Sequence, residues 1–575
     1  MKRGAAWLAG GLVLLLLGSS RAQTEPSTPA AGPMATPGPS AADSAKGTSQ
    51  SPEATAAARY NRGVQLYHAG QWKEAQAEFE AVLGMEPEDV TTLCWLGCLL
   101  LQQKRVDEAI DYLERATRLK PQYALAHNNL ACAYLEKKLP EAALEHYRKA
   151  LQSDPQYADA YYNLGNLYTD QKKFEEAFQN YQKAIQLQEA RIKEVDRQLQ
   201  PAGRGDPELQ KQAEGLRQQL GEYYNNLGKA YHLLAEERRA QGSQEAAEQA
   251  LSRAAGAYQR AVQLAPQRLL FWTNLGLVQW QRRPPHLDQA IQALEQAVKL
   301  SDRDGGGKRE EAEALQRFTA FLYLGKGYTE KERFPEAEQA FFQARLLQPQ
   351  NFWVHFHLGQ LYARQKSFEK AEAAYLQALQ LQPEEPTALN NLGCVYFQMQ
   401  RWDEAIAQFQ KTLEKQPEWP LAHTNLALAY QRQGRTDQAR REWDWVVKKE
   451  PDNLPARLAL GHLHFQRQEY PEAETHYQKA LELGAQDPAL LNNLGVIYLE
   501  RDEVGLAEAS FKRALDLDAR NVAACNNLGV CYERRGNKAK ALEMYRKALA
   551  IDPKNEDARF NRDRLSAPEA PAKGR

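Results

Sequence analysis

The feature that most constrains this chain is a small residue, usually a glycine after leucine, that returns every 34 residues. A fixed period of this length is typical of chains that stack one supersecondary unit many times. Eleven units keep the phase in two uninterrupted runs, so we predict a stack of repeats and not a single globular core. The small residues are Gly63, Gly97, Ala131 and Gly165 in the first run, and Gly325, Gly359, Gly393, Ala427, Gly461, Gly495 and Gly529 in the second.

The spacing within one unit predicts two short helices. Twelve residues after Gly359 comes Ala371, an aromatic ring follows four residues later at Tyr375, and Pro383 closes the unit. Apolar residues three, four and seven apart give each helix one buried face. The small residue lets the two helices approach closely, the ring fills the space between them, and proline ends the second helix.

The composition agrees with an all-helical chain and argues against one class of partner. The chain is rich in Ala, Leu, Gln, Glu and Tyr, and poor in the Val-Ile-Thr clusters that strands prefer. Its 73 Lys and Arg residues balance 74 Asp and Glu residues. Because phosphate binding depends largely on excess positive charge, no nucleic-acid partner is expected.

The pattern resembles one known repeat family. The unit around Leu358, Gly359 and Tyr362, and the same pattern in its neighbours, is similar to the tetratricopeptide repeat over about residues 56–555. The resemblance implies an all-α fold, an α-solenoid of about thirteen antiparallel helix pairs stacked into a right-handed superhelix with a concave groove. Stacking is physically necessary, because one pair cannot bury its apolar faces alone. Ala485 and Ala519 stand where proline is expected, so those helix ends are less sharply defined.

The period breaks between Gly165 and Gly325, which divides the repeats into three parts. We predict a block of four repeats at residues 56–189, divergent repeats with helical-hairpin insertions at 190–317, and a block of seven repeats at 318–555. The insertion is interpreted either as a tolerated lengthening or as a hinge or docking site between the blocks. Its two apolar faces, separated by a turn at 201–207, contain Ile192, Val195 and Leu199 on one side and Leu209, Ala213, Leu216 and Leu220 on the other.

The two ends of the chain differ from the repeats. Lys2 and Arg3 precede an apolar run at 5–17 and the small residues Ser20 and Ala22, the order of a secretory signal at residues 1–22. The run is shorter than the roughly 20 residues that span a membrane. An uncleaved anchor is the alternative, and it would allow membrane association through this segment. Residues 23–55 are predicted to be a disordered Ala/Pro/Ser-rich tether, and residues 556–575 a capping helix and tail.

Signals of catalysis and of cofactor binding do not emerge from the sequence. His355 and His357 are two residues apart, so on a helix they point to different sides and cannot share a metal. The glycine-rich segment Gly305–Lys308 is followed by Arg309, where a phosphate-binding loop has Ser or Thr. Six cysteines lack the spacing of a disulfide framework and are interpreted as buried small apolar residues. We expect no enzyme activity, no cofactor, no metal and no small-molecule substrate.

One polar position recurs among these apolar helices. Asparagine stands two residues before the small residue in nine of thirteen units, and we call these nine residues the asparagine column. An asparagine amide can pair with both groups of a peptide bond, so the column could hold an extended peptide by its backbone. This resembles the asparagine ladder in the repeat domain of O-linked N-acetylglucosamine transferases, although no counterpart of their catalytic domain is expected here. The members are Asn61, Asn129, Asn163, Asn226, Asn274, Asn391, Asn425, Asn493 and Asn527.

Two questions about the column stay open at this level. Asparagine could instead serve the geometry of the helix pairs. The column also has gaps, at Trp95, Tyr323, His357 and Ala459. Trp95, Trp353 and Trp419 are either aromatic anchors for a ligand or part of the core.

The sequence therefore predicts an exported protein–protein interaction scaffold, periplasmic or secreted, whose groove binds extended segments of other proteins. The alternative is a structural assembly component of cell-envelope machinery, such as a pilus, a secretion system or polysaccharide export.

Overall fold

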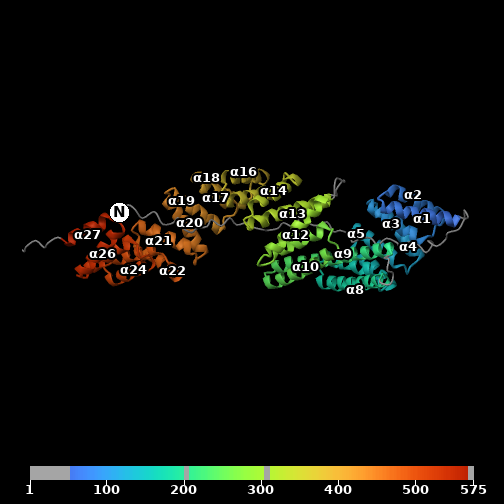
Figure 1. Cartoon of the computed structure of the whole chain (residues 1–575), viewed down its shortest axis with the longest axis horizontal. Coiled ribbons are helices and arrows are strands. Elements are labelled where there is room, and N and C mark those ends of the chain that lie inside the picture. Colours follow the sequence, from blue (N-terminus) through green and yellow to red (C-terminus); the bar gives the residue numbers. More distant parts are fainter. Residues whose placement is uncertain (1–51, 200–205, 304–310, 567–575) are drawn as a thin grey trace, which may run out of the picture. The chain divides into compact units, whose positions relative to one another are not determined.

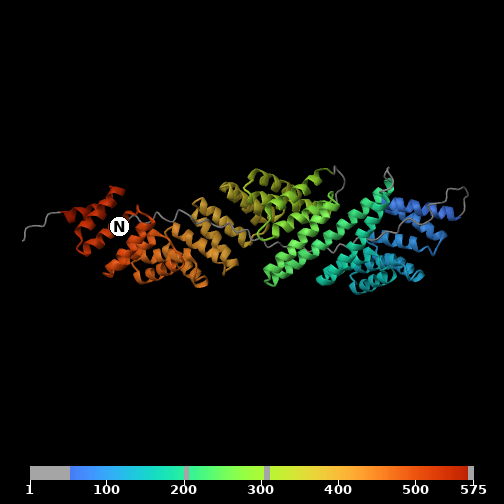
Figure 2. The ribbon, with the colours of Figure 1, turned by 60° about the horizontal axis from the view of Figure 1, so that its bottom comes forward.

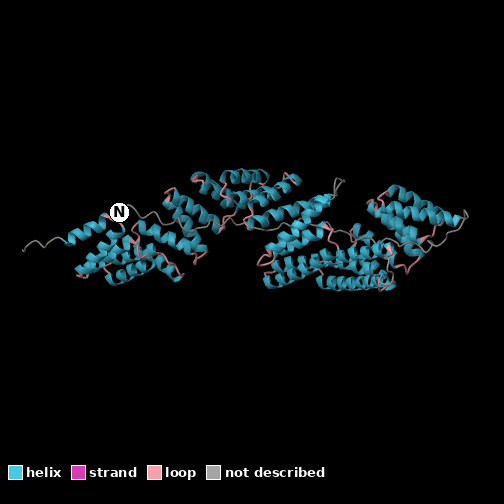
Figure 3. Cartoon of the chain, in the orientation of Figure 1, coloured by secondary structure: helices cyan, strands magenta, loops and turns pink. Residues whose placement is uncertain are grey.

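The computed structural model describes residues 52–199, 206–303 and 311–566, and over these residues it contains helices and no strand (Figure 1, Figure 3). The described chain falls into two compact units, and the boundary between them in the sequence is between Pro349 and Gln350. We call them the N-terminal unit and the C-terminal unit. The prediction of an all-α solenoid is confirmed.

Fourteen helices form the N-terminal unit. They are α1 (Pro52–His68), α2 (Trp72–Met85), α3 (Val90–Gln102), α4 (Val106–Leu119), α5 (Ala124–Glu136), α6 (Pro140–Ser153), α7 (Ala158–Asp170), α8 (Phe174–Leu199), α9 (Pro207–Ala240), α10 (Gln244–Leu264), α11 (Leu269–Gln281), α12 (Leu287–Arg303), α13 (Glu311–Glu330) and α14 (Phe334–Leu347).

Thirteen helices form the C-terminal unit. They are α15 (Phe352–Arg364), α16 (Phe368–Leu381), α17 (Pro386–Gln398), α18 (Trp402–Lys415), α19 (Pro420–Arg432), α20 (Thr436–Lys449), α21 (Leu454–Gln466), α22 (Tyr470–Glu482), α23 (Pro488–Glu500), α24 (Val504–Leu517), α25 (Val522–Arg534), α26 (Lys538–Ile551) and α27 (Glu556–Ser566).

Consecutive helices pack as pairs, and within each unit the pairs stack in chain order (Figure 1, Figure 2). In every pair the odd-numbered helix comes first, and we call it the first helix; its even-numbered partner is the second helix. Thirteen pairs are followed by α27 alone in the described chain, as the sequence predicts.

The predicted contact between the small residue and the ring holds each pair together. A Cβ atom on Gly359 would lie 2.7 Å from the Tyr375 ring, and Tyr375 and Ala371 are both fully buried. The turn after the first helix needs a left-handed residue to end that helix. Gly434 fills this position after α19 with φ 79°. Lys366 takes the same conformation, with φ 60°, after α15, two repeats earlier.

The insertion lengthens existing helices and adds no separate hairpin of its own. α8 and α9 run for 26 and 34 residues, and their extended parts pack on each other. Ile192 and Val195 share one apolar cluster with Leu216 and Leu220, which confirms the predicted pairing of the two faces. Most of the predicted turn, at residues 200–205, lies outside the described residues.

The ends of the chain are described only in part. The predicted signal and the tether up to residue 51 lie outside the described residues, as does the tail from residue 567. The tether prediction was wrong for Pro52–Thr55, which form the first turn of α1. Arg559 and Arg564 of α27 are exposed, as predicted for a capping helix, and Arg562 is half-buried. Among the described helices none is long and apolar enough to cross a membrane.

Candidate functional site: the asparagine column

The asparagine column lies on the first helices of both units. Four members are buried and five are half-buried. The buried members are Asn129, Asn163, Asn391 and Asn425; the half-buried members are Asn61, Asn226, Asn274, Asn493 and Asn527.

Hydrogen bonds from several members of the column connect a repeat to the one before it. The Nδ2 of Asn425 donates to the Oδ1 of Asn390 at 3.0 Å, across 35 residues of sequence. The same bond, at the same distance, runs from Asn163 to Asn128 and from Asn527 to Asn492. In each case the acceptor is the residue just before the column position of the preceding repeat. This contact favours the geometric role that the sequence left open.

The acceptors are asparagines that sequence reasoning missed. In α5, Asn128 also donates to Asn129 at 3.1 Å, and in α9, Asn225 donates to Asn226 at the same distance. The two kinds of bond together make short chains that run from repeat to repeat. The recurring dipeptide Asn-Asn before leucine was the signal that could have identified them. The missed acceptors are Asn128, Asn225, Asn390, Asn492 and Asn526.

A further member of the column lies on the capping helix. Asn561 of α27 donates to Asn526 at 3.0 Å, the same bond that connects the repeats inside the unit. It was missed because Arg562 and Asp563 follow it, where the other units have leucine and a small residue. The hydrogen-bonded chain therefore reaches the last described helix.

Buried thiols and phenols accept the other column bonds. Asn129 donates to Cys98 at 3.1 Å, and Asn425 also contacts Cys394 at 3.5 Å. Burial raises the pKa of Cys394 to about 12, so the thiol stays protonated and is only a weak acceptor. All six cysteines are free and buried, which confirms the apolar interpretation of these residues.

Phenol hydroxyls hold two column members more firmly. Asn226 donates to the Tyr162 hydroxyl at 2.6 Å, and Asn493 donates to the Tyr477 hydroxyl at 2.9 Å. Burial raises the pKa of Tyr477, while the hydrogen bond from Asn493 acts in the opposite direction. Tyr477 is the ring that packs against Gly461 in the repeat before that of Asn493, so this bond connects the column to the core.

The gaps in the column have different structural roles. Trp95 is 1 % exposed, stacks on Phe79 and donates from Nε1 to the Tyr60 hydroxyl at 2.9 Å, so it belongs to the core. Trp353 is half-buried, and its ring stacks on His357, with 6.0 Å between centroids.

Ala459, another gap, and Trp419, which lies outside the column, differ in burial. Ala459 is buried, whereas Trp419 is half-buried and precedes the first turn of α19. Of the three tryptophans singled out in the sequence, Trp95 is thereby placed in the core, and Trp353 and Trp419 keep part of their surface in solvent.

Nothing in the described residues resembles a metal centre. No group of three or more His, Cys, Asp or Glu side chains in this part of the chain is placed to hold a metal ion. The Gly305–Lys308 segment lies outside the described residues.

Replacing Asn425 by alanine is expected to lower the free energy of unfolding by about 1–3 kcal/mol. The change removes a buried donor and leaves the Asn390 oxygen without this partner. Asn180→Ala, at a half-buried position of α8, is the matched control and should cost less than about 0.5 kcal/mol, because alanine favours helix and the lost bond is exposed. Urea unfolding of the full chain measures both; equal losses would show that the column bonds add nothing to stability.

Comparison with known proteins shows that the chain carries tetratricopeptide repeats. Family models described as tetratricopeptide or TPR repeats match residues 60–124, 141–172, 158–190, 488–521 and 522–555. A model described as the C-terminal domain of cilia and flagella-associated protein 70 matches residues 205–486. No curated protein matches the chain.

Solved structures with a similar fold share little sequence with this chain. PilF of Pseudomonas aeruginosa is 18 % identical over 37 % of this chain and 96 % of its own, with a TM-score of 0.33. The Cut9–Hcn1 hetero-tetramer of APC/C is 13 % identical over 89 % of this chain and 96 % of the matched chain (TM-score 0.32). Yeast Tom70 is 15 % identical over 83 % and 94 % (TM-score 0.30). At these values none of the three supports an argument about function.

Proposed function

We propose that this protein is an exported scaffold that binds extended peptide segments of partner proteins along its first helices. The coarse part of this proposal, a protein-interaction scaffold, is what tetratricopeptide repeats generally provide. The peptide-binding part is supported by the half-buried members of the asparagine column. Export is supported by the charge and apolar pattern of residues 1–22.

The observation that carries the proposal is a spare donor on these asparagines. Asn274, Asn527 and Asn561 are half-buried, and in the described part of the chain the Nδ2 of each has one acceptor. An amide nitrogen carries two hydrogens, so each can donate once more. Asn527 and Asn561 lie one repeat apart in the C-terminal unit, so both can donate to carbonyl groups of one extended chain.

This arrangement changes the predicted role of the ladder. The sequence alone predicts that the oxygen and the nitrogen of each asparagine both bind the ligand. Here the column connects the repeats first, and Asn274 and Asn527 then each offer one N–H to a ligand. The buried Asn163 and Asn425 contribute rigidity, and a face that is already rigid loses less entropy when it binds.

A photoreactive amino acid placed at Val530 tests whether ligands lie on this face. Val530 is half-buried in α25 and follows Asn527 by three residues, which puts both on the same side of the helix. Leu506, 54 % exposed on the second helix α24, is the control position. The probes are dodecapeptides selected on the full chain from a displayed library of unstructured sequences.

We expect the selected peptides to crosslink from position 530 and not from position 506. Adding Asn527→Ala should weaken peptide binding, with helix content by circular dichroism unchanged. Selection of no peptide at all, or crosslinks confined to position 506, would rule out the first helices as the binding face.

The family-model match over residues 205–486 favours a second candidate, a structural component of a large assembly. The matched family takes its name from cilia and flagella, which are large assemblies. For this chain, the signal-like N-terminus suggests an assembly of the cell envelope instead. A tagged full chain that sediments with an assembly and stays there after Asn527→Ala would support this candidate over peptide binding.

A further inference from the structure

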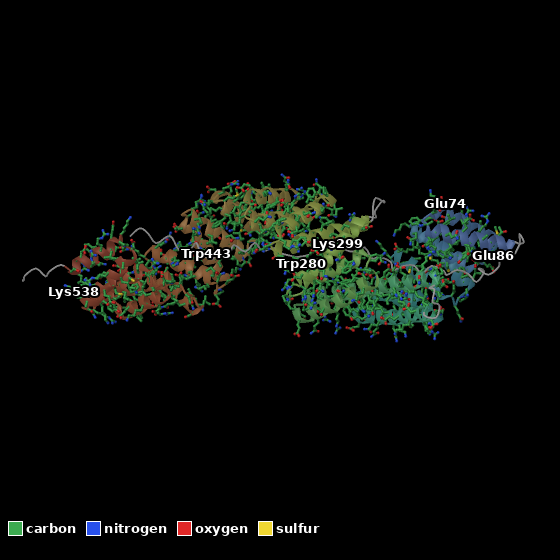
Figure 4. All side chains as sticks on the ribbon, viewed as in Figure 1. Glu74, Glu86, Trp280, Lys299, Trp443 and Lys538 are labelled. Carbon is green, nitrogen blue, oxygen red and sulfur yellow. The ribbon has the colours of Figure 1, made fainter. Side chains whose placement is uncertain are left out.

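Two neighbouring first helices of the N-terminal unit bring a lysine against two aromatic rings. The Lys326 ammonium of α13 lies 4.4 Å from the centre of the Tyr323 ring and 5.2 Å from that of Trp280 in α11. The two rings meet edge to face, with 6.1 Å between their centres. All three side chains are half-buried, so the cluster is accessible from solvent. Figure 4 labels Trp280 in this unit.

Lys326 differs from two other lysines that lie over rings, Lys449 and Lys512, because no carboxylate pairs with it in the described chain. Lys449 lies over Trp445 and also binds Glu418 at 2.7 Å. Lys512 lies over Tyr532 and binds Glu508 at 2.6 Å. For Lys326, the structure gives ring contacts and no ion pair.

Burial also disfavours the charged form of this ammonium. It lowers the pKa of Lys326 to about 8, although the charge of Glu330, one turn later on the same helix, acts in the opposite direction. Hydrogen bonding to Glu508 instead raises the pKa of Lys512. A partly desolvated cation without an anion is stabilised when a carboxylate arrives, and ring faces compensate only part of the lost hydration.

The cluster also stands at a gap in the asparagine column. Tyr323 occupies the column position of α13, and Asn274 occupies it in α11, the preceding first helix. In α13 the asparagine amide, which could bind a peptide backbone, is therefore replaced by Tyr323, and Lys326 of α13 and Trp280 of α11 lie against this ring. Contacts of this kind distinguish between side chains, which a row of amide donors does not.

We propose that Lys326, Trp280 and Tyr323 form a subsite that binds an acidic side chain of an extended peptide from a partner protein. The carboxylate would pair with the ammonium, and the aliphatic stem of the glutamate or aspartate would pack on the rings. This proposal rests on the proposed function, since it specifies one residue of the bound segment.

The test uses the full chain and a positional-scanning library of acetylated, amidated dodecapeptides, each position fixed in turn as glutamate or as glutamine. We expect the wild type to prefer glutamate at one position by roughly tenfold, the size of a charge-assisted hydrogen bond. Lys326→Met should abolish the preference, and Lys326→Arg should retain it. Lys299→Met removes an exposed lysine of the neighbouring helix α12 and should leave the preference unchanged.

The outcomes separate this subsite from the proposed function. A wild type that binds the library but shows no glutamate preference overturns the subsite and leaves peptide binding in place. A preference that survives in Lys326→Met overturns it as well. A wild type that binds no member of the library defeats the proposed function and the subsite together.

Discussion

Trp443→Ala is expected to lower the free energy of unfolding of the repeats around α20 by about 3–5 kcal/mol. Trp443 is 1 % exposed and packs in the same cluster as Leu426, Tyr430 and Leu460 (Figure 4). Its Nε1 donates to the Gln431 side chain at 3.1 Å. Truncating the tryptophan therefore leaves a cavity where the aromatic ring of this repeat was packed. It also leaves the Gln431 side chain without this hydrogen bond.

Hydrogen exchange detected by mass spectrometry measures this loss where it occurs. Because each repeat contacts only its neighbours, we expect faster exchange in α19–α21 and unchanged exchange in α1–α4. Trp72→Ala is the control, since Trp72 is 41 % exposed at the start of α2 and its removal leaves no cavity. Comparable losses of exchange protection in the two variants would show that the burial of the tryptophan does not determine how much stability its removal costs.

The parts of the fold that could be predicted are those that depend on contacts within one repeat. Gly359, Ala371 and Tyr375 are separated by 12 and 16 residues in sequence, and these spacings recur in every regular unit. A periodic pattern therefore determines which small residue meets which ring, and the structure places both where the spacing requires. The same holds for the paired faces of α8 and α9, which carry matching apolar positions.

The parts that could not be predicted depend on contacts between repeats. The bond from Asn425 to Asn390 joins two residues whose roles differ, and only the distance between the stacked helices reveals it. Trp95 could not be assigned to core or ligand from sequence, because its partners Tyr60 and Phe79 belong to the preceding pair. The spacing of a single unit contains no information about its neighbour.

The candidate subsite was missed for a related reason. Tyr323 was identified only as a gap in the asparagine column, and Lys326 and Trp280 gave no signal in the sequence. The three residues come together because α11 and α13 are consecutive first helices. A gap in a repeated position was thus the one sequence feature that pointed to this place.

Gly461→Ala is expected to lower the free energy of unfolding by about 1–3 kcal/mol, although one methyl group is all that is added. The new Cβ would lie 2.6 Å from the ring of Tyr477, which is fully buried. The ring cannot move aside freely, because its hydroxyl is bonded to His462 at 2.7 Å and to Asn493 at 2.9 Å. The change therefore both strains the core and displaces Asn493, a member of the asparagine column.

Gly256→Ala makes the same chemical change where there is room for it. Gly256 is exposed within α10, and a Cβ there would meet nothing within 4 Å. Because alanine loses less backbone entropy in a helix, we expect a gain of about 0.5–1 kcal/mol. Urea unfolding of both variants, with peptide binding measured alongside, checks the argument. A loss of stability and of peptide binding for Gly461→Ala, with a gain of stability and unchanged binding for Gly256→Ala, would support the argument. Changes in the free energy of unfolding that have the same sign in both variants would contradict it.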